Sequence, residues 1–157
     1  MRLSKNFTLS EMTKSQTAQR LGIENNPDEL QIENMRELSE KILQPIRDEF
    51  GPVRVTSGLR VPELNTALSG SKYSQHCKGE AADIDMCSNV CDKKNAEVFA
   101  WIVSNLIWDQ MIWEFGNDSC PDWIHISYSY GKNRREVLKA VKKKGKTSYI
   151  NLNDVTI

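Results

Sequence analysis

Residues 74–83 of the chain read Ser74-Gln75-His76-Cys77-Lys78-Gly79-Glu80-Ala81-Ala82-Asp83, and they contain one of only two histidines in the sequence. From residue 82 the chain continues Ala82-Asp83-Ile84-Asp85-Met86, which alternates between apolar and acidic residues. This alternation predicts a strand that turns Asp83 and Asp85 to one face. We therefore expect His76 on the loop that enters the strand and Asp83 within the strand.

The second histidine, His125, lies in a similar alternating run, Asp122-Trp123-Ile124-His125-Ile126-Ser127-Tyr128. As a strand this run would turn Ile124 and Ile126 toward a core and His125 the other way. If the two strands pair, His125 lies near His76 and Asp83. Two histidines and one carboxylate match the three protein ligands that a catalytic zinc ion usually takes, with a fourth position left for water.

These motifs resemble those of a known enzyme family. The pattern S-x-H-x-x-G-x-A-x-D, with W-x-H following after a further stretch of chain, is similar to that of the zinc peptidases that include D-Ala-D-Ala carboxypeptidases, D-Ala-D-Ala dipeptidases and phage L-alanyl-D-glutamate endolysins. The likeness runs from about Ser57 to Tyr128. It implies a Zn²⁺ cofactor on His76, Asp83 and His125. It also implies hydrolysis of peptidoglycan stem peptides, as a D,D-carboxypeptidase or as an L-alanyl-D-glutamate endopeptidase of the phage endolysin kind.

The resemblance implies roles for two residues outside the ligand set. Arg60 stands where the family has the arginine of an S-G-x-R turn, and it would hold the substrate carbonyl and the negative charge that develops on its oxygen. Ser74 would lie beside the bound peptide. From the residues alone, Arg60 could instead cap a surface turn and Ser74 could simply orient His76.

Two carboxylates are candidates for the general base. Related enzymes carry an acidic residue three positions before the second histidine, which is Asp122 in this chain. Positions three apart on a strand face opposite ways, so Asp122 reaches the metal only if the chain bends after Pro121. Glu114, on a neighbouring predicted strand, is the rival. We place Asp122 first and Glu114 second.

The length of 157 residues allows one domain with a real core and is too short for two ordinary domains. We expect an α+β fold in which a small antiparallel sheet carries the zinc site and packs against several helices. N-terminal helices would occupy residues 8–50, the catalytic core residues 51–130, and a basic C-terminal helix and tail residues 131–157.

Helix and strand signals support this division. Thr8-Leu9-Ser10-Glu11 reads as a capping box for a helix to about Arg20. Asn26-Pro27 would start a longer helix that ends at Gly51 and is kinked at Pro45. The other predicted elements are strands within 53–60, 110–116 and 122–128, helices over 61–68, 94–107 and 133–144, and an edge strand or frayed end after them.

The formal net charge is zero, but the charge is unevenly spread. Eight of the 21 Lys and Arg residues lie between Gly131 and Lys146, with Glu136 as the only acidic residue there. Such a segment could bind an anionic polymer, although we favour a solvated helix face. Nucleic acid is a weak candidate because no aromatic residues are interleaved with the lysines. The expected partner is a peptidoglycan stem peptide, and a monomer is expected.

No apolar run approaches the length of a transmembrane helix, and the N-terminus lacks the apolar region of a secretory signal. We therefore expect synthesis in the cytoplasm, no membrane partner, and action on the cell wall after release. The four cysteines would then be reduced thiols. Cys87 and Cys91 could form a second zinc half-site, but no further histidine is available to complete it.

Two other functions use the same residues. A non-catalytic zinc module for cell-wall binding or another interaction is one, because the scaffold that the motifs resemble also occurs in the Hedgehog signalling domain. An iron oxygenase with two histidines and one carboxylate is the other. Such sites usually carry the carboxylate two positions after the first histidine, where this chain has Lys78.

Overall fold

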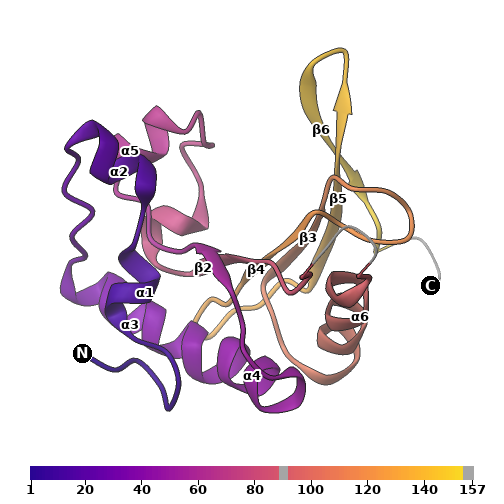
Figure 1. The fold of residues 1–157 in the computed structure, drawn as a ribbon, viewed down its shortest axis with the longest axis horizontal. Coiled ribbons are helices and arrows are strands. Elements are labelled where there is room, and N and C mark those ends of the chain that lie inside the picture. The colour runs from indigo at the N-terminus through magenta and orange to yellow at the C-terminus, as the bar shows by residue number, and fades with distance from the viewer. Residues whose placement is uncertain (89–91, 154–157) are drawn as a thin grey trace.

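The structure is a computed structural model that describes residues 1–88 and 92–153. Within these ranges, helices and short helical turns pack against one six-stranded sheet (Figure 1). The helical elements are α1 (Leu9–Thr13), α2 (Gln16–Leu21), α3 (Glu29–Leu38), the π-helical turn η1 (Ser39–Leu43), α4 (Gln44–Phe50), α5 (Pro62–Ala67), the 3-10 turn η2 (Gln75–Lys78) and α6 (Lys94–Asn105). The strands are β1 (Val55–Ser57), β2 (Ala81–Ile84), β3 (Gln110–Glu114), β4 (Trp123–Ser127), β5 (Glu136–Lys143) and β6 (Lys146–Asn151).

The strand order in the sheet is β1-β2-β4-β3-β5-β6. Four of its neighbouring pairs are antiparallel, and β3 and β5 are parallel. The predicted pairing of the two motif strands is confirmed, because β2 and β4 pair with Asp83 opposite His125. The strands predicted within 110–116 and 122–128 are present as β3 and β4, which pair as an antiparallel hairpin. The α+β class, with a mostly antiparallel sheet packed against helices, is therefore correct.

The two faces of the sheet have different chemistry. One face turns Ala82, Ile84, Ile124 and Ile126 into the core, where all four are fully buried. They pack there with residues of α3, η1, α4 and α6, which are Met35, Leu38, Ile42, Leu43, Ile46, Val98, Phe99 and Ile102. In Figure 1, α4 and α6 lie below the sheet and the β5–β6 hairpin rises away from them. The alternating side chains, including Asp83 and His125, point to the other face.

The N-terminal helices differ in detail from the prediction. The capping box of Thr8 and Glu11 is present, but its helix ends at Thr13, and Ser15 caps a second helix. The longer helix starts at Glu29 with Asp28 as its cap, not Asn26. Its Asp28 and Gln31 form a capping box of their own, which satisfies two N–H groups of the first turn.

The kink predicted at Pro45 takes the form of the π-helical turn η1, which directly precedes it. Proline has no N–H to donate, and its ring collides with the carbonyl four residues earlier in a regular helix. The wider π turn, in which the Gln44 N–H bonds to Ser39 O, lets the helical run continue to Phe50.

The predicted basic helix over 133–144 is wrong. Residues 136–143 form β5, which turns at Lys144 and Gly145 and returns as β6. Both turn residues have positive φ, 48° and 76°, as a two-residue type I′ hairpin turn requires. The return strand β6 lies at the edge of the sheet. For the residues after the predicted helix, an edge strand was one of two expectations, and a frayed end was the other.

The described cysteines, Cys77, Cys87 and Cys120, are free and half-buried. Cys91, the second half of the Cys87-x3-Cys91 pair, lies outside the described residues. Within the described ranges no helix is both long enough and apolar enough to cross a membrane.

The turn after β1 passes very close to α1 at Gly58. A Cβ atom at this position would lie 2.2 Å from the carbonyl oxygen of Met12, which is backbone and cannot rotate away. The next residue, Leu59, donates its N–H to the same oxygen at 2.8 Å. Only glycine therefore fits between β1 and α1 without moving one of them.

Gly58→Ala is expected to lower the free energy of unfolding by about 2 to 3 kcal/mol, because overpacking against backbone forces a shift of the turn. Gly131→Ala is the control, since Gly131 has positive φ but nothing within 4 Å of an added Cβ, and it should cost only about 1 kcal/mol. Urea unfolding measures both. Equal effects of the two changes would refute the close approach.

Candidate metal centre

Three potential ligand atoms meet on the polar face of the sheet. His76 Nε2 lies 3.3 Å from Asp83 Oδ1 and 3.2 Å from His125 Nδ1, and His125 Nδ1 lies 3.1 Å from Asp83 Oδ1. His76 comes from η2, Asp83 from β2 and His125 from β4. The structure thus brings together the three residues that the sequence predicted as ligands, which we call the triad.

The triad fits a divalent metal ion. Ligand bonds of about 2.0 to 2.1 Å in a tetrahedral site place neighbouring ligand atoms about 3.3 Å apart. The three distances in the triad match that spacing closely, and all three residues are buried. An uncompensated cluster of two imidazoles and a carboxylate would be costly to bury, whereas a shared cation satisfies all three. The donor set is the one that zinc and similar ions prefer.

The backbone fixes the His76 ring. Its Nδ1 lies 2.7 Å from the carbonyl oxygen of Gly58, and a carbonyl can only accept, so Nδ1 carries the proton. The lone pair is therefore on Nε2, which points at Asp83 and His125. A hydrogen bond of this kind is how metal-binding histidines are usually oriented.

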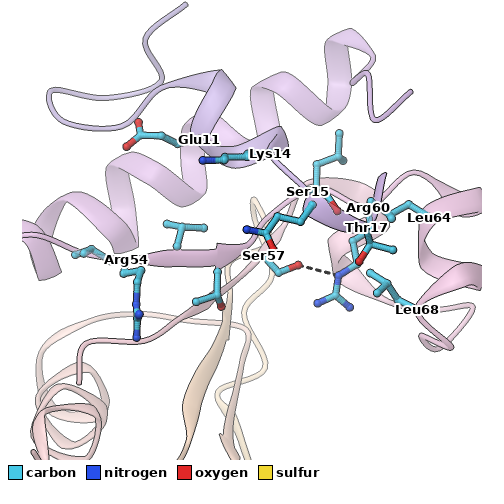
Figure 2. A pocket seen from close by; sticks show the side chains of 14 residues that line it. Glu11, Lys14, Ser15, Thr17, Arg54, Ser57, Arg60, Leu64 and Leu68 are labelled. Atoms are coloured by element: carbon cyan, nitrogen blue, oxygen red, sulfur yellow. Dashed lines mark hydrogen bonds between the residues drawn. The ribbon is translucent and has the colours of Figure 1, made fainter. Parts of the chain in front are cut away.

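Arg60 orients the carboxylate of the triad. Its Nη2 donates to Asp83 Oδ2 at 2.6 Å, which leaves Oδ1 for the two histidines. Its Nε donates to Ser57 Oγ at 2.9 Å, and Figure 2 shows this bond. Burial opposes ionisation of Asp83, but in the metal-free protein protonated His76 and His125 outweigh it through their charges and hydrogen bonds and hold the pKa of Asp83 well below its usual range.

Arg60 stands at the boundary between two hollows. One is lined by β1, α5 and the α1–α2 segment, as Figure 2 shows, with Glu11, Lys14 and Arg54 on its rim. The other holds the triad, has a volume of about 580 Å³, and is lined also by Ser74, Glu114, Trp123 and Tyr149. We call the second hollow the cleft. Arg60 and Ser74, the two further predicted site residues, both line the cleft.

The two candidate bases have different positions. Glu114 lines the cleft and pairs with Trp123, two residues before His125 on the same face of β4. Asp122 is exposed and lines a separate hollow with Phe115 and Lys139. Its N–H donates to Glu114 O at 2.9 Å, so it continues the ladder of the hairpin, and no bend after Pro121 brings its side chain to the triad.

The environment of Glu114 suits proton transfer. Burial raises the pKa of its carboxyl to about 7, and the charge of Asp83 adds to the rise while His125 and Arg60 oppose it. Its side chain is only 9% exposed. A carboxyl that titrates near neutrality can both take and return a proton.

The loop that carries His76 is held from behind by a buried carboxylate that the sequence did not single out. Asp109, 3% exposed, accepts from Gln75 Nε2 at 2.9 Å and from Arg134 Nη2 at 2.7 Å. The hydrogen bonds from Arg134 outweigh burial and lower the pKa of Asp109. The sequence signal for this role was the position of Asp109, a charged residue directly between the apolar Trp108 and the strand predicted from residue 110.

Glu114→Gln is expected to stabilise the metal-free protein at pH 8 and to leave its stability unchanged at pH 4. The pKa of Glu114 is about 7 in the folded state and 4.5 ordinarily, so ionisation of this carboxyl disfavours the folded state. The effect is absent below pH 4.5, grows as the pH rises to 7, and reaches up to about 3 kcal/mol above pH 7. Urea unfolding with a chelator at both pH values measures the difference. The same effect at pH 4 and pH 8 would contradict the raised pKa.

The comparison with curated proteins gives no match. A family model for peptidase M15 matches residues 5–127, which span most of the chain and include the triad, Arg60 and Glu114. The members of this family are metal-dependent peptidases, in agreement with the geometry of the triad. The resemblance seen in the two sequence motifs is thereby confirmed, and the chain belongs to the peptidase M15 family.

Proposed function

We propose that this protein is a zinc peptidase that hydrolyses a bond in the stem peptides of peptidoglycan, either as a D,D-carboxypeptidase or as an L-alanyl-D-glutamate endopeptidase. The observation that carries the proposal is the triad, whose three ligand atoms lie 3.1 to 3.3 Å apart within a cleft that also contains a carboxyl poised near neutral pH. Family membership supports the peptidase chemistry. The stem-peptide substrate rests on the two sequence motifs.

His76, Asp83 and His125 are the proposed zinc ligands. The chemistry that zinc supplies in such a site is Lewis acidity toward the scissile carbonyl and toward water. The protein keeps the ligands in place through the bonds of Gly58 O to His76 and of Arg60 to Asp83. Because these supporting groups come from one turn after β1, a change in that turn would disturb two ligands at once.

Glu114 is the proposed general base. It would take a proton from the attacking water and deliver it to the leaving amine, and a pKa near 7 suits both steps. Asp122, the first choice from sequence, lies outside the cleft and is proposed to be a surface carboxylate. Arg60 keeps its predicted role toward the developing oxyanion, in addition to its bond with Asp83, and Ser74 remains the proposed contact for the bound peptide.

Arg60→Ala is expected to weaken zinc binding by about 10- to 100-fold, the usual effect of losing a hydrogen bond to a ligand. His125→Ala should weaken it further, because it removes a ligand. Competition with a chromogenic chelator measures both affinities. Arg54→Ala is the matched control, since Arg54 pairs with Asp85 away from the triad. Unchanged affinity in Arg60→Ala would remove the orienting role.

Glu114→Gln is expected to lower kcat by about 10²- to 10⁴-fold with zinc still bound, as loss of a general base does. Asp122→Asn should change kcat by less than about threefold. The assay is amine release from purified peptidoglycan and from a synthetic stem tetrapeptide, with zinc content measured on the same samples. Loss of activity in Asp122→Asn alone would restore Asp122 as the base.

The same assay separates catalysis from binding. A zinc-loaded wild-type protein that releases no amine at any pH would be a non-catalytic zinc module, the other function considered from sequence. Mass analysis of products from a defined muropeptide identifies the bond that is cut. We propose that the protein meets this substrate at the cell wall after release from the cell.

A further inference from the structure

The β5–β6 hairpin lies beyond the part of the chain that matches the peptidase family, since that match ends at residue 127. Even so, Arg134, Leu138, Thr147 and Tyr149 line the same cleft as the triad. The cleft of this chain is therefore completed by a wall that the family match does not contain. In Figure 1 the hairpin rises from the sheet next to β3, the strand that carries Glu114.

The strand register places an apolar floor between the triad and this wall. His125 pairs with Ile112, and Ile112 pairs with Leu138. Register partners on neighbouring strands point to the same face, so the row runs from an imidazole to two aliphatic side chains. At about 4.8 Å per strand, Leu138 lies about 10 Å from His125, which is the length of about three extended peptide residues.

Tyr149 stands at the far end of a second row. Trp123, Glu114, Ala140 and Tyr149 are successive register partners across β4, β3, β5 and β6. Only Ala140, a small residue, lies between Glu114 and Tyr149 in this row, and burial followed by the charges of Glu114 and Asp83 raises the pKa of Tyr149. Its side chain is nevertheless 57% exposed. An aromatic ring is thus held open toward the cleft.

The two sides of the triad differ in polarity. Away from the hairpin the cleft is lined by Arg60 and by Ser69, Ser71 and Ser74. Two of the hairpin's lysines are engaged elsewhere: Lys139 bonds to Asp118 on the opposite face of the sheet, and Lys142 donates to Thr147 Oγ1 and lies over the Phe115 ring. Arg134, which also lines the cleft, is paired with Asp109 and Glu136. Beside Thr147, the hairpin side of the cleft therefore offers the aliphatic side chain of Leu138 and the ring of Tyr149.

We propose that Ile112, Leu138 and Tyr149 form a subsite for an apolar side chain of the substrate, within about three residues of the scissile bond, and that Tyr149 sets the preference for it. An apolar side chain would be buried there against three hydrophobic groups. A carboxylate would lose water there, and the Arg134 guanidinium in the same wall is already paired with Asp109 and Glu136. The subsite rests on the proposed peptidase function for its substrate, whereas its chemistry follows from the lining residues.

The test uses the stem pentapeptide L-Ala-D-Glu-L-Lys-D-Ala-D-Ala and analogues in which each position in turn carries leucine or aspartate. Tyr149→Ala removes the wall. Ile150→Ala is the matched control, because Ile150 lies next to it on β6, points to the opposite face and is 42% exposed. For each zinc-loaded protein kcat and KM are measured separately. Binding of the same peptides is measured by calorimetry on Glu114→Gln protein, with and without Tyr149→Ala.

We expect wild-type protein and Ile150→Ala to favour leucine over aspartate at one position by about tenfold or more in kcat/KM, and Tyr149→Ala to reduce this ratio below about threefold through KM. No preference at any position, or a preference that survives Tyr149→Ala, overturns the subsite. If wild-type protein cleaves none of the peptides, the proposed function fails and calorimetry decides the subsite alone. In that case a ratio of Kd for the aspartate peptide to Kd for the leucine peptide that disappears with Tyr149→Ala supports the subsite. An unchanged ratio overturns the subsite.

Discussion

The antiparallel register that sets Asp83 opposite His125 is the constraint on which the site depends. In a strand the side chains alternate, so a slip of one residue would turn His125 into the core and an isoleucine into the cleft. Ile124 and Ile126, on either side of His125, are fully buried against the helices. The hydrophobic packing that holds the sheet on α3, α4 and α6 therefore also fixes the ligands on the opposite face.

The second requirement is to hold a carboxylate and two imidazoles together in a buried place. Asp83 divides its oxygens, one toward the histidines and one toward Arg60, so neither oxygen is buried without a polar neighbour. The turn that supplies Arg60 is tied to η2 twice, by Gly58 O to the His76 ring and by Arg60 N–H to His76 O. Since Gly58 has no side chain, this turn can lie against α1 at the required distance.

The sequence predicted which three residues meet in the triad, but not all of the elements around them. The strict alternation of residues about Asp83 and His125 fits a strand and no helix. In a helix the isoleucines of these runs would be spread around the surface instead of lying on one face. Residues 136–143 fit both a helix and a strand. Val137, Leu138 and Val141 would lie on one face of a helix, whereas Leu138 and Ala140 would lie on one face of a strand. The parallel pairing of β5 with β3 decides between them, and such a long-range contact leaves no local mark. Lys144-Gly145 was the one local signal of a hairpin.

The same parity explains why the base is assigned to β3. Asp122 is three residues from His125, so its side chain belongs to the opposite face of the sheet. Glu114 is two residues from Ile112, the register partner of His125, so its side chain lies on the same face as His125. The sheet thus separates the proposed tasks by strand: β2 and β4 carry two of the proposed ligands, β3 carries the proposed base, and β5 and β6 line one side of the cleft. Because β6 is an edge strand that, in the described sheet, pairs with β5 alone, its cleft-facing side chains can change without altering the pairing of β2 and β4. The edge of the sheet is therefore where substrate preference can vary while the chemistry of the central strands is kept.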